Sequence, residues 1–229
     1  MTENATSPAL RRRRAKAGLA RRTGPSLDTK IQPRQARAQD TFELILVTAG
    51  ELLRTVGFEQ LTTNLICEHA GITPPALYRY FPNKYAVLRE LGDRLMRAQD
   101  VEVIAWIDAG GLRGETFDDR LASSIAIHER VVAIQRDFPG GVAIGRALRA
   151  VPLLQDVRFK SRDLVAAHFY RAMRELHPGV ASHRLEVAMR MMVELSYAAT
   201  EMVVEEPDRD ADTINREVCL LFAHYFDNF

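Results

Sequence analysis

The chain has little of what builds disulfide-stapled or membrane-spanning proteins. Its 229 residues hold only two cysteines, Cys67 and Cys219, which lie far apart and belong to no CxxC or paired Cys/His pattern. Neither a disulfide framework nor a metal site is therefore expected. No apolar run approaches the roughly 20 residues that span a bilayer. The Arg-rich start has no apolar stretch behind it that would make a secretory signal, so we expect a cytoplasmic protein, with a transit peptide as the alternative reading of this start.

Catalytic motifs are also absent. The sequence contains no GxSxG, P-loop, GxGxxG or HExxH pattern. Its six histidines are scattered, and no Glu-x-x-His repeat indicates a di-iron bundle. We therefore expect no enzyme, no metal and no cofactor.

Glycine and aromatic residues are sparse, with 13 glycines and 7% aromatics, whereas Ala, Leu, Arg and Glu are abundant. This balance favours helices. No segment alternates apolar and polar residues over the length of a strand and ends in a hairpin signal. The sequence therefore predicts an all-α fold.

The net charge of +1 conceals a strong asymmetry. Residues 1–37 hold ten Lys and Arg against two acidic residues, a net charge of +8, which leaves −7 for the remainder. Residues 1–34 also contain proline and glycine and almost no large apolar side chains, so we expect a disordered basic arm. A basic arm on an acidic body suggests that one end contacts a polyanion, although a solvated tail is the plainer alternative.

Helical periodicity begins near Gln35. One apolar stripe runs through Phe42, Ile45, Leu46, Ala49, Leu52, Leu53 and Val56. Gly57 follows the last apolar residue, at the position where helices commonly stop. Thr62 or Thr63 then caps a short helix that extends through His69.

Three further signals extend the pattern. Gly71 sits in a tight turn, and Thr73 caps a third helix with Pro74 at its first position. Asn83 caps a fourth helix that continues to about Ala109. Proline and glycine breaks separate the remaining helical stretches, which we expect at 116–137, 141–150, 153–177, 181–205 and 210–227.

Short helices with a glycine turn between the second and third predict a helix-turn-helix. Ile66 and Ala70 face inward, while Leu77 and Phe81 hold the third helix from behind. A helix of this length fits the major groove of DNA, entered by its N-terminal residues. We assign residues 35–85 to this domain.

Several residue pairs at fixed spacing make the pattern more specific than a lone helix-turn-helix. They are Gly57-Phe58, Thr62-Thr63, Ala70-Gly71-Ile72, Leu77-Tyr78, Tyr80-Phe81 and Lys84. Residues 38–90 thereby resemble the N-terminal domain of the TetR family of bacterial transcription regulators. The rest of the chain resembles the family only in length and helicity.

The resemblance implies DNA contacts at nine positions. They are Thr63, Asn64, Pro74, Pro75, Ala76, Tyr78, Arg79, Tyr80 and Lys84. Tyr78 and Lys84 resemble the phosphate clamps. Many members have Gly and Thr where this chain has Pro75 and Ala76, which shifts base reading toward Arg79 and Tyr80. The alternative is that the tyrosines are core aromatics.

The resemblance also implies that residues 86–229 sense a ligand and form a homodimer. Helices 181–205 and 210–227 would pair with their twins, the alternative being an ordinary monomeric core. An apolar cavity would lie between the middle helices, lined by Trp106, Ile127, His128, Phe138, Phe169, Met173 and Met191. The alternative is that these side chains simply fill the core.

The function that these expectations favour is a homodimeric repressor. It would bind a palindromic double-stranded operator, be released by a small, largely apolar effector, and have no membrane partner. One alternative is a DNA-binding regulator or architectural protein without a small ligand. Another is a helical-bundle interaction module or enzyme.

Overall fold

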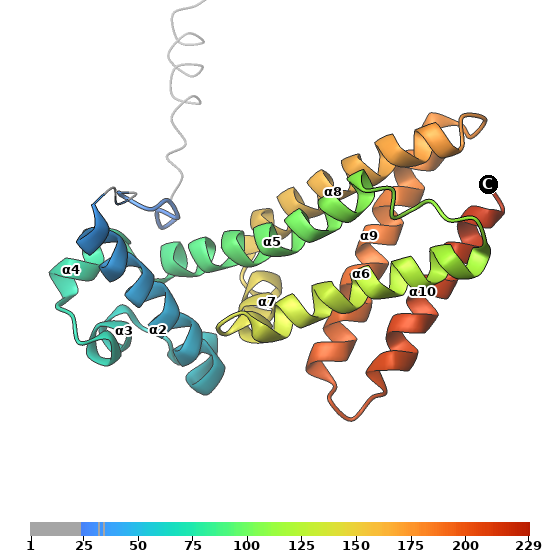
Figure 1. Ribbon diagram of the computed structural model, residues 1–229. Helices are drawn as coiled ribbons and strands as arrows, with labels where there is room; N and C mark the ends of the chain where they lie inside the picture. The colour runs from blue at the N-terminus through green and yellow to red at the C-terminus, as the bar shows by residue number, and fades with distance from the viewer. Residues whose placement is uncertain (1–23, 32, 34) are drawn as a thin grey trace, which may run out of the picture.

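The computed structural model describes residues 24–31, 33 and 35–229. Within these residues the chain forms nine α-helices, one short 3-10 helix and no strand, so the all-helical prediction is confirmed. None of these helices is both long and apolar enough to cross a membrane. Most of the predicted basic arm, residues 1–34, lies outside the described residues. Figure 1 shows an elongated molecule, with α2 to α4 at one end and α6 to α10 toward the other.

The first described helix, α2 (Ala36–Gln60), is amphipathic, and it buries the predicted apolar stripe from Phe42 to Leu53. Its backbone leaves helical geometry at Gly57, where φ is 74° and ψ is 176°. Only glycine adopts such a conformation without strain. Gly57 therefore interrupts the helix where the sequence predicts its end, and a further turn follows to Gln60.

Helices α3 (Thr63–Ala70) and α4 (Pro74–Tyr78) complete the helix-turn-helix. The Thr62 hydroxyl accepts a hydrogen bond from the Leu65 N–H at 3.1 Å, and Gly71 takes the left-handed conformation in the turn. Thr73 precedes α4 as expected, but its side chain makes no capping hydrogen bond. The two prolines that follow Thr73 lack an N–H group, and the N–H of Ala76 is bonded to the Thr73 carbonyl.

Helix α5 (Lys84–Asp108) joins the two ends of the molecule (Figure 1). The Asn83 side chain caps it by accepting a hydrogen bond from the Ala86 N–H at 3.0 Å. Its 25 residues span about 37 Å at the usual rise of an α-helix. One rigid rod therefore begins in the helix-turn-helix and ends at the far side of the second domain.

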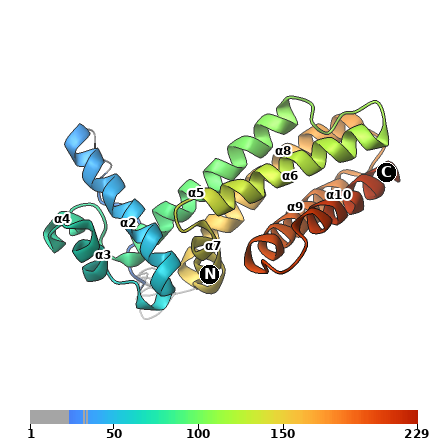
Figure 2. The same cartoon turned by 60° about the horizontal axis from the view of Figure 1, so that its bottom comes forward.

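The remaining elements form the larger helical domain. They are α6 (Phe117–Asp137), α7 (Gly141–Ala150), the 3-10 helix η1 (Pro152–Leu154), α8 (Gln155–Leu176), α9 (Ser182–Glu205) and α10 (Ala211–Asp227). Thr116 and Asp119 form a reciprocal capping box at the start of α6. Figure 2 shows α9 and α10 side by side, joined by a short loop.

The buried apolar residues fall into three clusters. The largest joins α2, α3, α4 and the first half of α5 to α7 and η1, so the two regions assigned from sequence share one core. Its fully buried members include Phe42, Leu53, Phe81, Leu88, Ile144, Leu148 and Leu154. A second cluster lies among α5, α8 and α9, and a small third cluster lies where α6, α9 and α10 meet.

The α6–α7 turn touches α2 backbone to backbone. A Cβ atom added at Gly140 would lie 2.2 Å from the carbonyl oxygen of Gly50, and one added at Gly50 would lie 2.5 Å from that of Pro139. Gly140 also has a φ of 72°. Two glycines therefore bring the larger domain into direct contact with the first helix of the helix-turn-helix.

This contact predicts a strong effect of Gly140→Ala. The substitution combines a left-handed backbone with a clash against Gly50, and we expect it to lower the free energy of unfolding by about 2–4 kcal/mol. Thermal and urea denaturation followed by circular dichroism measure the change. Gly179→Ala is the matched control, because a Cβ there has no neighbour within 4 Å. Equal stability of the two variants would contradict the tight contact.

Candidate DNA-binding surface and ligand cavity

The recognition helix α4 stands on a rigid base. Leu77 and Phe81 are fully buried, and the Phe81 ring stacks on Phe42 of α2 with ring centroids 4.8 Å apart. Ile72, which follows the Gly71 turn, packs against the same core. The inward side of α4 is thereby fixed, and its other side faces solvent.

Most of the residues expected to contact DNA lie on that outer side. Asn64, Pro74, Pro75, Tyr78 and Arg79 are exposed, while Thr63 and Ala76 are half-buried. The Thr63 and Tyr78 hydroxyls form a hydrogen bond of 3.0 Å. This bond joins α3 to the end of α4 and places two hydroxyl groups together at the surface, an arrangement suited to a phosphate oxygen.

The expectation that Tyr80 is available to DNA is wrong. Tyr80 is 3% exposed, and its ring meets Phe42 edge to face with centroids 5.7 Å apart. Helix α4 ends at Tyr78, and the turn that follows directs Tyr80 inward. Of Arg79 and Tyr80, only Arg79 therefore presents its side chain to solvent.

Lys84 is occupied by the protein itself. Its ammonium group donates to the carbonyl oxygen of Phe58 at 3.1 Å and lies 4.5 Å from the centre of the Phe58 ring. These contacts offset the unfavourable position of a cation at a helix N-terminus. Lys84 therefore ties α5 to the end of α2, and its ammonium group already has partners within the protein.

Sequence reasoning missed the segment 24–31. The Lys30 backbone N–H donates to the Tyr80 carbonyl at 2.8 Å, and its ammonium group donates to the Tyr78 carbonyl at 2.9 Å. The Asn83 side chain donates to the Ser26 carbonyl at 2.8 Å. This segment therefore crosses the end of the recognition helix. No periodicity marks such contacts, because they use main-chain carbonyls.

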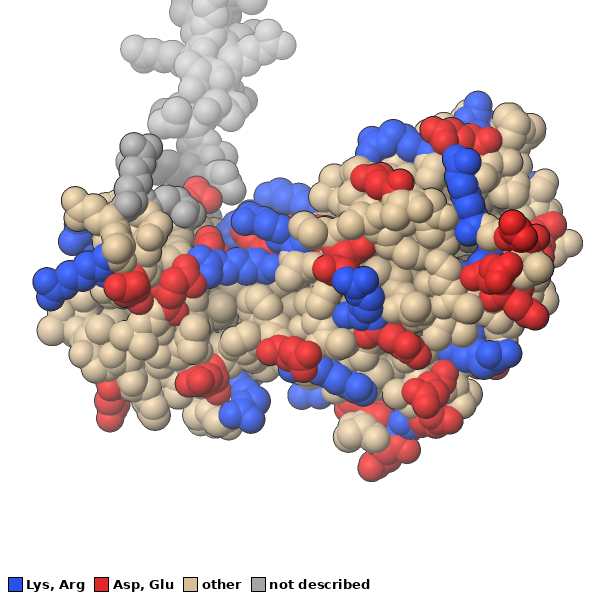
Figure 3. Space-filling view, in the orientation of Figure 1, with Lys and Arg blue, Asp and Glu red and all other residues tan. Residues whose placement is uncertain are grey.

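The helix-turn-helix domain itself has little net charge. Residues 38–98 contain six Lys and Arg against seven acidic residues. In Figure 3 this end of the molecule shows scattered charges of both signs over a mainly uncharged surface. General attraction to a polyanion must therefore come from elsewhere, and the sequence holds its concentrated positive charge before residue 38.

The larger domain contains a partly open cavity of about 550 Å³. Helices α5, α6, α8, α9 and α10 all contribute to its wall. The apolar part of the wall includes Val103, Trp106, Leu112, Ile127, Val165, Phe169, Met173, Met192, Phe222 and Phe226. Its size and composition match those of small-molecule sites.

Five of the seven residues expected to line a cavity do so. They are Trp106, Ile127, His128, Phe169 and Met173. The expectation is wrong for Phe138, which ends α6 and packs against the core of the helix-turn-helix end. It is also wrong for Met191, which is 57% exposed. The next residue, Met192, turns into the cavity instead, because neighbouring side chains on a helix differ by about 100°.

A buried carboxylate lies in the cavity wall. Asp100 is 8% exposed and accepts a hydrogen bond of 2.6 Å from the Ser161 hydroxyl. Ser161 in turn lies 2.8 Å from the Tyr197 hydroxyl. Burial raises the pKa of Asp100 to about 6, although the hydrogen bond from Ser161 opposes this rise. The folded protein therefore keeps a costly charge inside its second domain at neutral pH.

His128 is a neutral polar group on the same wall. Its Nδ1 lies 2.8 Å from the Asn215 side-chain oxygen, and its Nε2 lies 3.3 Å from the Thr200 hydroxyl. Burial lowers the pKa of His128. Its Nε2 also lies 3.3 Å from the Ser196 carbonyl oxygen, so both ring nitrogens have polar partners within the protein.

Two glutamines link the cavity to the α6–α7 turn. Gln99 of α5, which lines the cavity, donates from Nε2 to Gln135 Oε1 at 2.9 Å. Gln135 then donates to the Gly141 carbonyl at 2.6 Å. The chain of contacts ends beside Gly140, where the turn meets α2.

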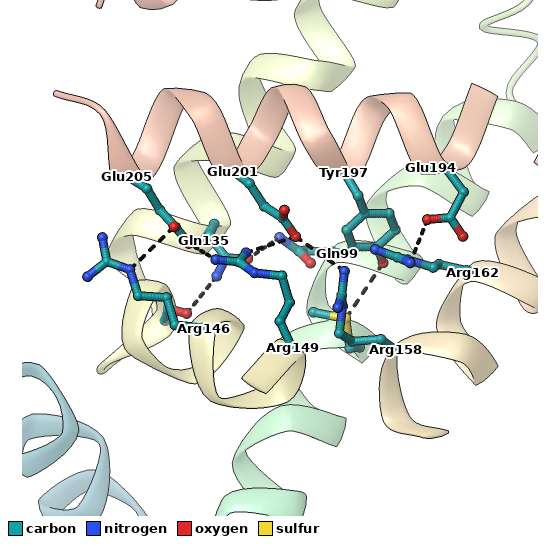
Figure 4. Close-up of polar contacts among 12 residues, drawn as sticks. Gln99, Gln135, Arg146, Arg149, Arg158, Arg162, Glu194, Tyr197, Glu201 and Glu205 are labelled. Atoms are coloured by element: carbon teal, nitrogen blue, oxygen red, sulfur yellow. Dashed lines mark hydrogen bonds and ion pairs between the residues drawn. The ribbon is translucent and has the colours of Figure 1, made fainter. Parts of the chain in front are cut away.

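A ladder of ion pairs fixes α9 to its neighbours, as Figure 4 shows. The acidic members, all from α9, face arginines of α7 and α8, and the set is Glu194, Glu201, Glu205, Arg146, Arg149, Arg158 and Arg162. Arg149 bridges Glu201 and Glu205, and Arg162 lies against Glu194 and over the Tyr197 ring. These ion pairs hold α9, which forms part of the cavity wall, against α8 and against α7, which packs on α2.

The comparisons with known proteins agree with this architecture. Residues 45–91 match the family model described as bacterial regulatory proteins, tetR family. The chain is 44% identical over 54 residues to the Escherichia coli tetracycline repressor protein class C, covering 24% of this chain and 25% of that protein. The chain thus spans about a quarter of the length of the curated relatives it matches.

Solved structures extend the likeness to the whole fold. A putative transcriptional regulator from Pseudomonas aeruginosa is similar with a TM-score of 0.67 and 15% identity, over 85% of this chain and 93% of that one. Thermus thermophilus FadR, a TetR-family repressor solved in complex with lauroyl-CoA, is similar with a TM-score of 0.54 and 22% identity, over 79% and 92%.

The fold and the sites define the class of protein. It is an all-helical protein with an N-terminal helix-turn-helix and a C-terminal helical domain that contains a cavity. Residues 45–91 thus carry the DNA-binding region described by the tetR family model, and the chain as a whole has the fold of solved TetR-family regulators.

The buried carboxylate predicts an unusual pH dependence of stability. Because the pKa of Asp100 is raised from 3.8 to about 6, its contribution to stability is full below 3.8 and is lost as the pH rises through 6. Asp100→Asn should therefore stabilise the protein at about pH 8, by about 2–3 kcal/mol, and this gain should shrink toward pH 5. Denaturation midpoints across this range measure it.

Asp156→Asn is the matched control with the opposite sign. Hydrogen bonds from Arg89 lower the pKa of Asp156 to about 2, so this carboxylate stabilises the folded state above its unfolded pKa. We expect Asp156→Asn to destabilise the protein at neutral pH. Destabilisation by Asp100→Asn at about pH 8 would show that the protein tolerates this charge without cost.

Proposed function

We propose that this protein is a homodimeric transcriptional repressor that a small, largely apolar effector releases from a palindromic operator. One observation carries the proposal: α5 belongs to both sites. Leu88 and Leu91 lie in the core under the recognition helix, while Gln99, Asp100 and Trp106 of the same helix line the cavity. A ligand that moves α5 therefore acts on the helix-turn-helix directly.

The DNA-binding role rests on the exposed side of α4. Arg79 reads guanine through its O6 and N7 atoms, Ala76 contacts a thymine methyl, and Thr63 with Tyr78 holds a phosphate. The exposed prolines at the start of α4 offer only apolar contact. The concentrated positive charge of residues 1–37 adds attraction that does not depend on sequence.

The dimer rests on an unpartnered apolar stripe. Along α9, the exposed side chains of Val187, Met191, Leu195 and Met202 follow one another at helical spacing. On the neighbouring α10, Leu221 is 62% exposed and Tyr225 is also exposed. A second copy that packs α9 and α10 against this stripe buries it on a two-fold axis. The two recognition helices then meet half-sites about 34–36 Å apart or a multiple of that spacing.

The release mechanism uses the contacts that join the cavity to α2. An effector among α5, α6 and α9 displaces the helices to which Gln99 and Gln135 belong. The α6–α7 turn, held against Gly50 without intervening side chains, transmits this displacement to the helix-turn-helix. DNA and effector thus favour different spacings of the two recognition helices, which is allosteric coupling through a two-state element. The size of the cavity supports a small ligand over a regulator without one.

Arg79→Ala tests the DNA-reading role. We expect a loss of about 1–3 kcal/mol in binding to an operator selected from random sequence, with relaxed preference at one base pair. Binding titrations on operator and random DNA across salt concentrations measure both effects. Arg97→Ala is the matched control, since Arg97 is exposed on α5 and lies about 20 Å along the helix from Lys84. Equal losses on operator and random DNA would contradict base reading by Arg79.

Leu195→Glu and Leu221→Glu test the dimer. Each places a charge that would be buried unpaired in the interface, so we expect monomers by light scattering. Operator affinity should fall by about 100-fold or more, because one recognition helix loses its tethered twin. Val101→Glu is the control, because Val101 is 59% exposed on α5, outside the stripe. A folded Leu195→Glu monomer with wild-type operator affinity would contradict the model.

A further inference from the structure

The cavity wall carries a carboxylate without a cationic partner and an amide oxygen without a hydrogen-bond donor. Among the described residues, Asp100 forms no ion pair, and its one side-chain hydrogen bond comes from Ser161. Ser161 and Tyr197 are neutral, so nothing adjacent neutralises the carboxylate. An unpaired charge that is more than nine-tenths buried is rare in proteins, because its desolvation costs free energy that no partner returns.

Gln99 supplies a second orphan acceptor, and the hydrogen-bond network fixes its orientation. The Gly141 carbonyl requires a donor, so Gln135 turns Nε2 toward it and presents Oε1 to Gln99. Gln99 must then present its own Nε2 to Gln135. Its Oε1 is left buried with no hydrogen-bond partner, on a residue that lines the cavity and is 3% exposed. Turning the Gln99 amide over would cost its hydrogen bonds to Gln135 Oε1 and to the Val131 carbonyl.

The arginines that line the cavity form ion pairs with carboxylates other than Asp100. Arg113 pairs with Glu175 at 3.1 Å, and Arg120 pairs with Asp227 at 2.7 Å. Arg113 lies in the loop between α5 and α6, and Arg120 lies near the start of α6. Burial lowers the pKa of His128, which favours its neutral form, although its hydrogen bonds with the Ser196 carbonyl and Asn215 oppose this shift. Arg162, which follows Ser161, lies over the Tyr197 ring and pairs with Glu194. Among the described residues, no ion pair joins any of these three arginines to Asp100.

The space in front of these acceptors is aromatic and rich in sulfur. Trp106 and Phe169 meet edge to face with centroids 6.1 Å apart, and Met173, Met192 and Phe222 continue the wall. Aromatic faces attract cations in a desolvated site. Methionine side chains adapt to irregular apolar shapes.

We propose that the effector is an organic cation, an apolar body bearing an ammonium group that pairs with Asp100, with a further N–H or O–H donor for Gln99. The inference deepens the proposed function and rests on it for the cavity's regulatory role. An ammonium group carries positive charge and only donates hydrogen bonds, which complements a carboxylate without a cationic partner and an amide oxygen without a donor. A fatty acyl anion would instead place its charge beside a buried carboxylate, or break the ion pairs of Arg113 and Arg120.

The test compares three probes that differ only in their head group: octylammonium, octanol and octanoate. Trp106 is the only tryptophan of the sequence and lies in the cavity wall, so its fluorescence reports occupancy without DNA. At about pH 8, where an alkylammonium is charged, we expect octylammonium to bind about 10- to 100-fold more tightly than octanol. Octanoate should bind most weakly.

Variants assign the preference to one carboxylate. Asp100→Asn should remove the advantage of octylammonium and leave octanol binding unchanged. Asp108→Asn, an exposed carboxylate at the end of the same helix, should change neither. Circular dichroism confirms that each variant is folded. Tighter binding of octanoate, an ammonium preference that survives Asp100→Asn, or no binding of any probe would overturn the proposal.

Operator release is measured separately. Octylammonium that binds through Asp100 and also displaces a selected operator supports both the ligand class and the regulatory role. If it binds through Asp100 without displacing DNA, the ligand class stands and the proposed function of the cavity fails.

Discussion

The burial of α5 against two partners is the constraint on which the rest of the structure depends. Its first half packs under the recognition helix, and its second half forms a cavity wall. Because one hydrophobic core joins α2 and α5 to α7 and η1, the two regions are not independent domains joined by a flexible linker. The second half of α5 borders a cavity and is less tightly packed than the first half. A ligand in the cavity can therefore shift the position of the whole helix.

Local chemistry made most of the fold predictable. Each helix start that carries a capping side chain, such as Thr62, Asn83 or Thr116, lies within a residue of its expected position. Gly57 and Gly71 have the positive φ that a stop and a tight turn require. These features depend on three or four neighbouring residues, so the sequence contains all the information they need.

Features that depend on distant partners were not predictable in the same way. Tyr80 and Tyr78 are alike as sequence, and only the end of α4 decides which ring is buried. Lys84 finds carbonyls of α2 that are 25 or more residues away. Met191 and Met192 point about 100° apart around α9, and only the packing of the whole domain decides that Met192 faces the cavity. The sequence does not show that Asp100 is buried without an ion pair, because this depends on which distant side chains surround it.

The contacts of residues 24–31 have a consequence for how the protein would follow DNA. Lys30 is bonded to the carbonyls of Tyr78 and Tyr80, so the root of the basic segment is attached to the end of the recognition helix itself. The root and the helix therefore turn as one piece. If α4 enters the major groove as proposed, a rotation of the domain that withdraws α4 would also move residues 24–31, to which the basic segment is joined.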